Sequence, residues 1–199
     1  MEITKLSIYD APKIAEIHLN SFKGFFLTSL GKKFLIKFYS SIIKSRQGVV
    51  IGLIYENELI GFAVGAKIKK GFYKSIFINN FFSLLFSCFS NLIRKPSKII
   101  KLIQSLLTEK NFNIDYSNSG TLLSICVSPT VSNKGFGKIL LKEFEKEIFK
   151  YNNVITLTTD NINNQYVNNF YINNGYILDA EFFQGNRKMN LYIKKNNYQ

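Results

Sequence analysis

The chain lacks tryptophan, has one histidine and has only two cysteines among its 199 residues. Cys88 and Cys126 form no CxxC motif, and one histidine cannot build a cluster of metal ligands. The sequence therefore argues against a disulfide scaffold and against a zinc site, and we expect no metal. Buried, reduced cysteines are typical of cytoplasmic proteins, which is the location that we expect.

Acidic residues are also scarce, with 13 Asp and Glu against 26 Lys and Arg and a formal net charge of +13. This excess suits an anionic partner: nucleic acid, a membrane surface or a phosphorylated small molecule. It would repel a polycation such as a polyamine, and no acidic run offers a cleft for one. Residues 1–5 carry Glu2 and no apolar core precedes Asp10, so we expect no signal peptide.

Hydrophobic residues make up 46% of the chain, which argues against disorder and allows one well-packed domain, residues 1–199. Asp10 and Pro12 mark a helix start, and Glu56-Asn57 indicates a hairpin. We expect strands at 3–8, 48–55, 58–69, 121–127, 154–159, 176–183 and 188–194, and helices after 10, from Thr28 to about 45, from Pro96 to 107, at 136–151 and at 163–173. This order predicts a mixed α/β (α+β) sheet.

A glycine-containing loop, Ser132-Asn133-Lys134-Gly135-Phe136-Gly137, separates a strand from a well-patterned helix. A helix N-terminus presents unpaired N–H groups with a partial positive charge, and it can bind phosphate. Gly135 and Gly137 would let the backbone approach an anion closely. A plain strand-to-helix turn is the alternative. The loop is neither a triphosphate P-loop nor a dinucleotide fingerprint.

A second element follows at the helix 163–173. Asn164 and Tyr171 are two helical turns apart and share a face. Gly175 can end that helix, and Tyr176 opens the next strand. A tyrosine on such a face can donate a proton to a leaving thiolate, and an asparagine can bind a polar chain. An ordinary packing role for Tyr171 is the alternative.

Taken together, Leu122 to Pro129, Asn133 to Leu141, and Asn164 through Phe170-Tyr171 to Gly175-Tyr176 resemble the acetyl-CoA motifs of the GNAT N-acetyltransferase superfamily. Order and spacing match over residues 120 to 180, and more loosely before them. The resemblance implies a mostly antiparallel sheet flanked by helices, with acetyl-CoA as co-substrate. It also implies direct attack by an amine on the thioester, without an acyl-enzyme.

The resemblance implies a role for each matching position. The main chain of the strand residues Ile125, Cys126 and Val127 would hold the acetyl carbonyl and the pantetheine arm. The loop from Ser132 through Asn133, Lys134, Gly135, Phe136 and Gly137 to Lys138 would bind the diphosphate. Asn164 would contact the cofactor, and Tyr171 would be the general acid.

Two positions depart from the family pattern. Ser132 stands where Arg or Gln is usual, and Thr121 stands where many members carry a glutamate base. Candidates for the acceptor site or the missing base are His18, Tyr116, Glu181 and Asp115. For His18, a partly buried packing role is the alternative. For Cys126, we favour a structural thiol over a nucleophile.

Residues 72–108 form an expected helical insertion. Ser75 to Ile93 carries no charge, but polar residues interrupt it and it lies within one sheet, so we reject a membrane span. An extra core helix, a lid or dimer surface, and peripheral membrane contact through residues 72–95 remain open. With Ser21 to Gly31, the insertion resembles a GNAT subgroup of bacterial surface-polysaccharide biosynthesis.

That subgroup implies an acceptor amine on an amino sugar linked to a nucleotide or lipid carrier. The small-molecule acceptor would then be phosphorylated, and we expect no nucleic-acid partner and a monomer or homodimer. A protein or peptide amine is the alternative acceptor. A non-catalytic basic module at a membrane surface is the alternative to an enzyme.

Overall fold

The computed structural model describes residues 1–79, 114–131 and 134–196. Its described strands form one seven-stranded sheet in the order β1-β2-β3-β4-β5-β7-β6. The strands are β1 (Glu2–Lys5), β2 (Gly48–Tyr55), β3 (Glu58–Ala66), β4 (Gly120–Val127), β5 (Val154–Asp160), β6 (Ile177–Gln184) and β7 (Arg187–Lys195). The helices are α1 (Ala11–Ser21), α2 (Phe26–Ser29), α3 (Lys32–Lys44), α4 (Phe72–Asn79), α7 (Phe136–Phe149) and α8 (Gln165–Asn173), with 3-10 turns η1 (Ile8–Asp10) and η2 (Pro129–Val131).

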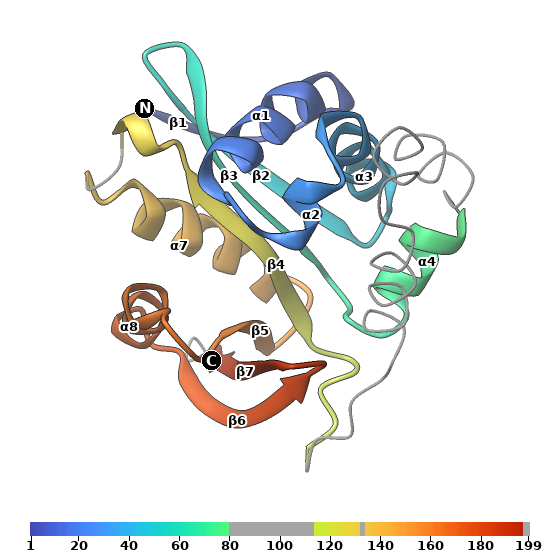
Figure 1. Cartoon of the computed structure of the whole chain (residues 1–199), viewed down its shortest axis with the longest axis vertical. Helices are drawn as coiled ribbons and strands as arrows, with labels where there is room; N and C mark the ends of the chain where they lie inside the picture. Colours follow the sequence, from blue (N-terminus) through green and yellow to red (C-terminus); the bar gives the residue numbers. More distant parts are fainter. Residues whose placement is uncertain (80–113, 132–133, 197–199) are drawn as a thin grey trace.

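Helices cover both faces of this sheet (Figure 1). The apolar stripes of α1 and α3 pack against one face of β2, β3 and β4 in a first core cluster. The helix α7 packs against the other face in a second cluster, to which Ile155 and Leu157 of β5 and Tyr192 of β7 also belong. The expected mixed, mostly antiparallel sheet flanked by helices is confirmed.

The sheet opens between β4 and β5, its one parallel pair of strands. Only Gly120 to Leu122 pair with Ile155 to Leu157, although both strands continue beyond these residues. A bulge in β4 also shifts the register with β3, because Gly65 pairs with Leu122 while Val64 pairs with Ser124. Bulges increase local twist and bend a strand. The two strands therefore diverge, and Figure 1 shows β5, β7 and β6 turning away from β4.

The hairpin between β2 and β3 forms where the sequence predicts it. Glu56 and Asn57 both have positive φ, 50° and 65°. Positive φ at both central residues defines the type I′ turn, whose twist matches that of the flanking strands. The hairpin at Glu56-Asn57 is confirmed.

Three expected boundaries were wrong, and one of them is the strand expected at 58–69, which ends at Ala66. Thr28 does not cap one long helix, because Gly31 at φ 88° separates α2 from α3 and the Thr28 hydroxyl donates to the Phe22 carbonyl oxygen at 2.5 Å. The first strand ends at Lys5, and the 3-10 turn η1 (Ile8–Asp10) follows after Leu6 and Ser7. Asp10 occupies the N-cap of α1 as expected, but its carboxylate accepts a hydrogen bond from the Ser7 N–H at 2.7 Å.

The expected insertion begins with α4, and its remainder lies outside the described residues, as does the helix expected from Pro96. Within the part of the chain that the structure describes, every helix is too short or too polar to cross a lipid bilayer.

Candidate functional site

The edge of β4 that faces β5 carries main-chain groups that pair with no other described strand. The Ser128 N–H donates to the Ile60 carbonyl of the β3 side at 2.6 Å. Residues of an antiparallel pair alternate between bonding toward their partner and pointing away from it, so Cys126 bonds toward β3 while Ile125 and Val127 point away. The pairing with β5 has already ended at Leu122. The N–H and C=O groups of Ile125 and Val127 therefore face the opening between the strands.

The N-terminus of α7 lies on one side of this opening. Gly135 is its N-cap in the left-handed conformation, at φ 76°, and accepts the first helical hydrogen bond from the Lys138 N–H at 3.1 Å. The N–H groups before Lys138 have no partner within the helix, as at every helix start. Phe136 anchors this turn, because its ring is buried and packs against Tyr55 with ring centroids 5.2 Å apart. Ser132 and Asn133 lie outside the described residues.

Steric crowding by the described residues does not explain why Gly135 and Gly137 are glycines. Among the described residues, a Cβ built on Gly135 would meet nothing within 4 Å, and one built on Gly137 would meet only the Phe170 ring, at 3.7 Å. The open space beside both residues fits the close approach of an anion such as a diphosphate.

The proximity of Gly137 to Phe170 brings the glycine-containing loop next to the helix that carries Tyr171. Phe170, which lies over the first turn of α7, directly precedes Tyr171 on α8. Tyr171 is buried in the second core cluster, with its ring edge-on to Tyr176 at 5.6 Å and tilted against Tyr192 at 6.1 Å. Burial raises the pKa of the Tyr171 phenol well above its usual range. The phenol is therefore protonated at neutral pH and able to donate.

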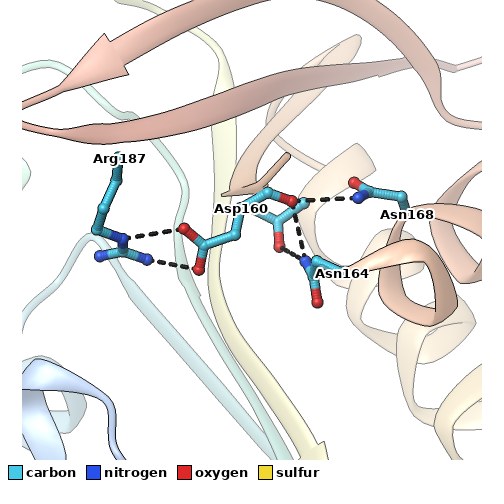
Figure 2. A network of polar contacts seen from close by, with 5 residues as sticks. Asp160, Asn164, Asn168 and Arg187 are labelled. Atoms are coloured by element: carbon cyan, nitrogen blue, oxygen red, sulfur yellow. Dashed lines mark hydrogen bonds and ion pairs between the residues drawn. The ribbon is translucent and has the colours of Figure 1, made fainter. Parts of the chain in front are cut away.

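Asn164 links α8 to the end of β5 (Figure 2). Its side-chain Nδ2 donates to Thr159 Oγ1 at 2.8 Å and to the Asp160 carbonyl at 3.1 Å. An amide nitrogen has two hydrogens, and both are used here. Any contact of Asn164 with a cofactor would therefore be made by its Oδ1 as an acceptor.

A buried polar network continues from the same carbonyl into β7. Asn168 donates to the Asp160 carbonyl at 3.1 Å, and its Oδ1 accepts from Asn190 and from the Tyr192 hydroxyl, each at 3.1 Å. Buried polar groups are stabilising only when satisfied, so this arrangement restricts how α8 can rotate on the sheet. It thereby fixes the direction of Tyr171, which lies one helical turn after Asn168.

His18 is buried on α1, on the face of the sheet that α1 and α3 cover. Its Nδ1 lies 2.7 Å from the Tyr39 hydroxyl, and its Nε2 has no partner among the described residues. Burial lowers the pKa of His18 to about 4. A neutral imidazole that bonds Tyr39 supports the packing alternative more than the role of a base.

This pKa predicts a pH dependence of stability. Between pH 6.5 and 4 the unfolded chain binds a proton at His18 that the folded chain does not bind, so stability falls as the pH is lowered through this window. We expect the free energy of unfolding to drop by about 1.5 kcal/mol between pH 6.5 and 5 from this residue. Urea unfolding of wild type and His18→Asn at both pH values measures it. Equal drops in the two proteins would contradict the assignment.

The other candidates for the base already have hydrogen-bond or ion-pair partners in the structure. The Tyr116 hydroxyl donates to Asp179 at 2.8 Å, beside the closed end of the β4–β5 pair, and the Asp115 carboxylate accepts from the Ser117 N–H and hydroxyl. Glu181 on β6 is paired with Lys188 on β7 at 2.6 Å and also accepts a hydrogen bond from Asn161, directly after Asp160, at 2.7 Å. Burial raises the pKa of the Cys126 thiol to about 12, which supports a structural role. No described His, Cys, Asp and Glu residues cluster as a metal site.

One charged pair near the opening has no counterpart in the sequence-based prediction. Arg187, at the start of β7, donates from Nε and Nη2 to the two carboxylate oxygens of Asp160, at 2.9 and 2.6 Å. Sequence reasoning missed it because the partners are 27 residues apart, and only the register of β5 with β7 brings them together.

Comparisons with known proteins identify the family and the fold. No curated protein matches the chain in sequence. Among solved structures, PaiA N-acetyltransferase of Thermoplasma acidophilum in complex with coenzyme A is 20% identical, with a TM-score of 0.60 and 98% of each chain covered. Ribosomal-protein-alanine N-acetyltransferase of Brucella melitensis is 12% identical, with a TM-score of 0.62, and 98% of this chain and 100% of that chain are covered.

A spermidine N-acetyltransferase chimera of Vibrio cholerae and hSSAT is also 12% identical, with a TM-score of 0.59 and coverage of 98% of this chain and 96% of that chain. At these identities the likeness shows the fold. A model of the acetyltransferase (GNAT) family matches residues 12–176, which is most of the chain and includes β4, the start of α7 and Tyr171. The chain therefore belongs to the GNAT acetyltransferase family.

Proposed function

We propose that the protein transfers the acetyl group of acetyl-CoA directly to a primary amine of an amino sugar carried on a nucleotide or lipid. One observation carries the transferase part of this proposal. The main-chain groups of Ile125 and Val127 that point away from β3 face the opening between β4 and β5, and Phe170, which precedes Tyr171 on α8, lies over the first turn of α7. The family assignment favours an enzyme over a non-catalytic basic module.

The diphosphate of the co-substrate would bind at the start of α7. The N–H groups of Gly135, Phe136 and Gly137 precede the first helical donor, Lys138, and the described residues leave open space beside both glycines. The partial positive charge of a 14-residue helix favours an anion there. Lys134 adds a full charge, with its Nζ held 5.5 Å from the centre of the Tyr55 ring.

The acetyl group and the pantetheine arm of acetyl-CoA would lie along β4. When bound, acetyl-CoA supplies an activated thioester. The strand offers the N–H and C=O groups of Ile125 and Val127 as fixed partners for its polar atoms. Tyr171, neutral at physiological pH, would donate its proton to the departing sulfur.

The amino-sugar acceptor rests on charge and on the resemblance of the first helices and the insertion to the polysaccharide subgroup. A formal net charge of +13 favours an acceptor that carries a diphosphate and disfavours a polyamine. A protein or peptide amine is the competing acceptor within the same reaction.

Two measurements test the proposal. Acetyl-CoA at about 100 times Kd stabilises a protein by about 2.7 kcal/mol, which for this chain length corresponds to a rise in Tm of about 5–10 °C. A thiol-release assay then compares the acetylation rates of four amines at equal concentration: a UDP-linked amino sugar, glucosamine, spermidine and a tetrapeptide with an N-terminal alanine. We expect the first to be acetylated fastest. A preference for the peptide would overturn the acceptor, and no effect of acetyl-CoA on Tm would overturn the transferase.

A further inference from the structure

Asp160 is the last residue of β5 and lies on one arm of the opening. The two strands that border the opening, β4 and β5, are last paired at Leu122 and Leu157. Ile125 lies three residues beyond the first, and Asp160 lies three residues beyond the second, about 10 Å along β5. Asp160 on β5 and Ile125 on β4 therefore lie the same number of residues beyond the point where the pairing of the two strands ends.

The Asp160 side chain projects from the face of the sheet opposite α7. Ile155 and Leu157 pack toward α7, so alternation places Thr158 and Asp160 on the other face. On β7, Tyr192 packs toward α7, whereas Leu191 and Ile193 belong to a separate cluster on the opposite face. Arg187 shares the face of these last two residues. An acceptor could thus reach Asp160 from the side opposite the proposed diphosphate site.

Arg187 fixes the carboxylate without burying it. The two parallel hydrogen bonds between guanidinium and carboxylate are a bidentate pair, which orients both groups. The Asp160 side chain is 26% exposed and that of Arg187 is 51% exposed. Each carboxylate oxygen accepts one hydrogen bond from Arg187 and keeps a further lone pair. The carboxylate therefore has capacity for another cation.

The main-chain carbonyl of Asp160 is held by side chains of α8 and its N-cap. The Asp160 carbonyl accepts from Asn164 and Asn168 of α8, while the carboxylate is held by Arg187 (Figure 2). Asp160 is thus fixed to the helix that carries Tyr171 and to β7. A residue held at both its main chain and its side chain is suited to present a charge in a constant direction.

From this placement we propose that Asp160 is the acceptor subsite for the substrate ammonium group, with Arg187 as its positioning residue. The proposal rests on the amine transfer proposed above. An acceptor amine reaches the protein mainly as a cation, and a surface of net charge +13 would repel it elsewhere. The carboxylate at the opening, fixed by Arg187, offers the ammonium group a further hydrogen-bond acceptor on each of its two oxygens.

The test is Asp160→Asn, which keeps the size of the side chain and removes its charge. The probe is whichever amine of the four-member panel wild type acetylates fastest, with hydroxylamine as a neutral nucleophile. We expect KM for the cationic amine to rise at least about tenfold, while KM for acetyl-CoA and the hydroxylamine rate stay within about twofold. Glu143→Gln, which removes an exposed ion pair with Lys146 on α7, should change none of these values.

An unchanged KM for the amine in Asp160→Asn, with wild-type activity intact, would overturn the subsite and leave the transferase standing. Wild type that acetylates none of the four amines would overturn both. If Asp160→Asn does not fold, Arg187→Lys keeps a positive charge but loses the bidentate geometry. That variant should raise KM for the amine about threefold and leave hydroxylamine unaffected, and equal losses for both nucleophiles would count against the proposal.

Discussion

Replacing Tyr171 by Phe should lower kcat about a hundredfold or more, the usual contribution of a positioned general acid, and leave the Kd of acetyl-CoA within about twofold. The ring packs in the core against Tyr176 and Tyr192, and Phe preserves those contacts. No described residue hydrogen-bonds the Tyr171 hydroxyl, so its removal leaves no unpaired partner among the described residues. Steady-state kinetics with the thiol-release assay, and calorimetric titration with acetyl-CoA, measure the two quantities.

Tyr166 supplies the matched control. It lies five residues earlier on the same helix, and its side chain is 77% exposed. Tyr166→Phe should retain wild-type kcat. If Tyr171→Phe also retains it, Tyr171 has no part in proton donation, and the site needs another acid.

The second large effect is expected for Gly137→Ala, in which stability and affinity should change in opposite directions. Gly137 is the second residue of α7, and alanine is favoured over glycine in a helix by roughly 0.5–1 kcal/mol. Its Cβ would meet only Phe170, at an ordinary 3.7 Å. The free protein should therefore keep or raise its Tm. The added methyl group would occupy the space proposed for the diphosphate, and Kd for acetyl-CoA should rise at least about tenfold, roughly 1.4 kcal/mol.

Gly135 and Gly71 form a control pair for backbone strain. Both have positive φ, 76° and 67°, and a Cβ on either would have open space around it. Alanine at either position should cost stability through strain alone. Only Gly135→Ala should also weaken acetyl-CoA binding. A loss of affinity in both variants, or an unchanged Kd in Gly137→Ala, would show that the anion does not bind at this turn.

Local signals predicted much of the fold that carries the site. The helix α7 was expected from its repeating apolar residues and glycine start, and the hairpin at Glu56-Asn57 from its turn residues, because each depends on neighbours within a few positions. Both are present. Thr28 was misjudged for the same reason. It has the chemistry of a helix cap, but the positive φ of Gly31 decides where α3 begins.

Long-range features could not be predicted from the residues alone. The divergence of β4 and β5 depends on where their pairing stops and on the bulge between Leu122 and Ser124. The Asp160–Arg187 pair depends on the register between two strands that are far apart in the sequence. Burial of His18 follows from the packing of α1 against α3 and β4. Each of these requires tertiary structure, which periodicity does not specify.

The proposed function requires that main-chain amides of two separate segments bind the same molecule of coenzyme A. A titration of ¹⁵N-labelled protein with coenzyme A, followed amide by amide in the NMR spectrum, tests this directly. We predict that the resonances of Gly135 to Lys138 and those of Ile125 and Val127 shift together and saturate at one Kd. Binding that shifts other amides while leaving both of these segments unchanged would contradict the account.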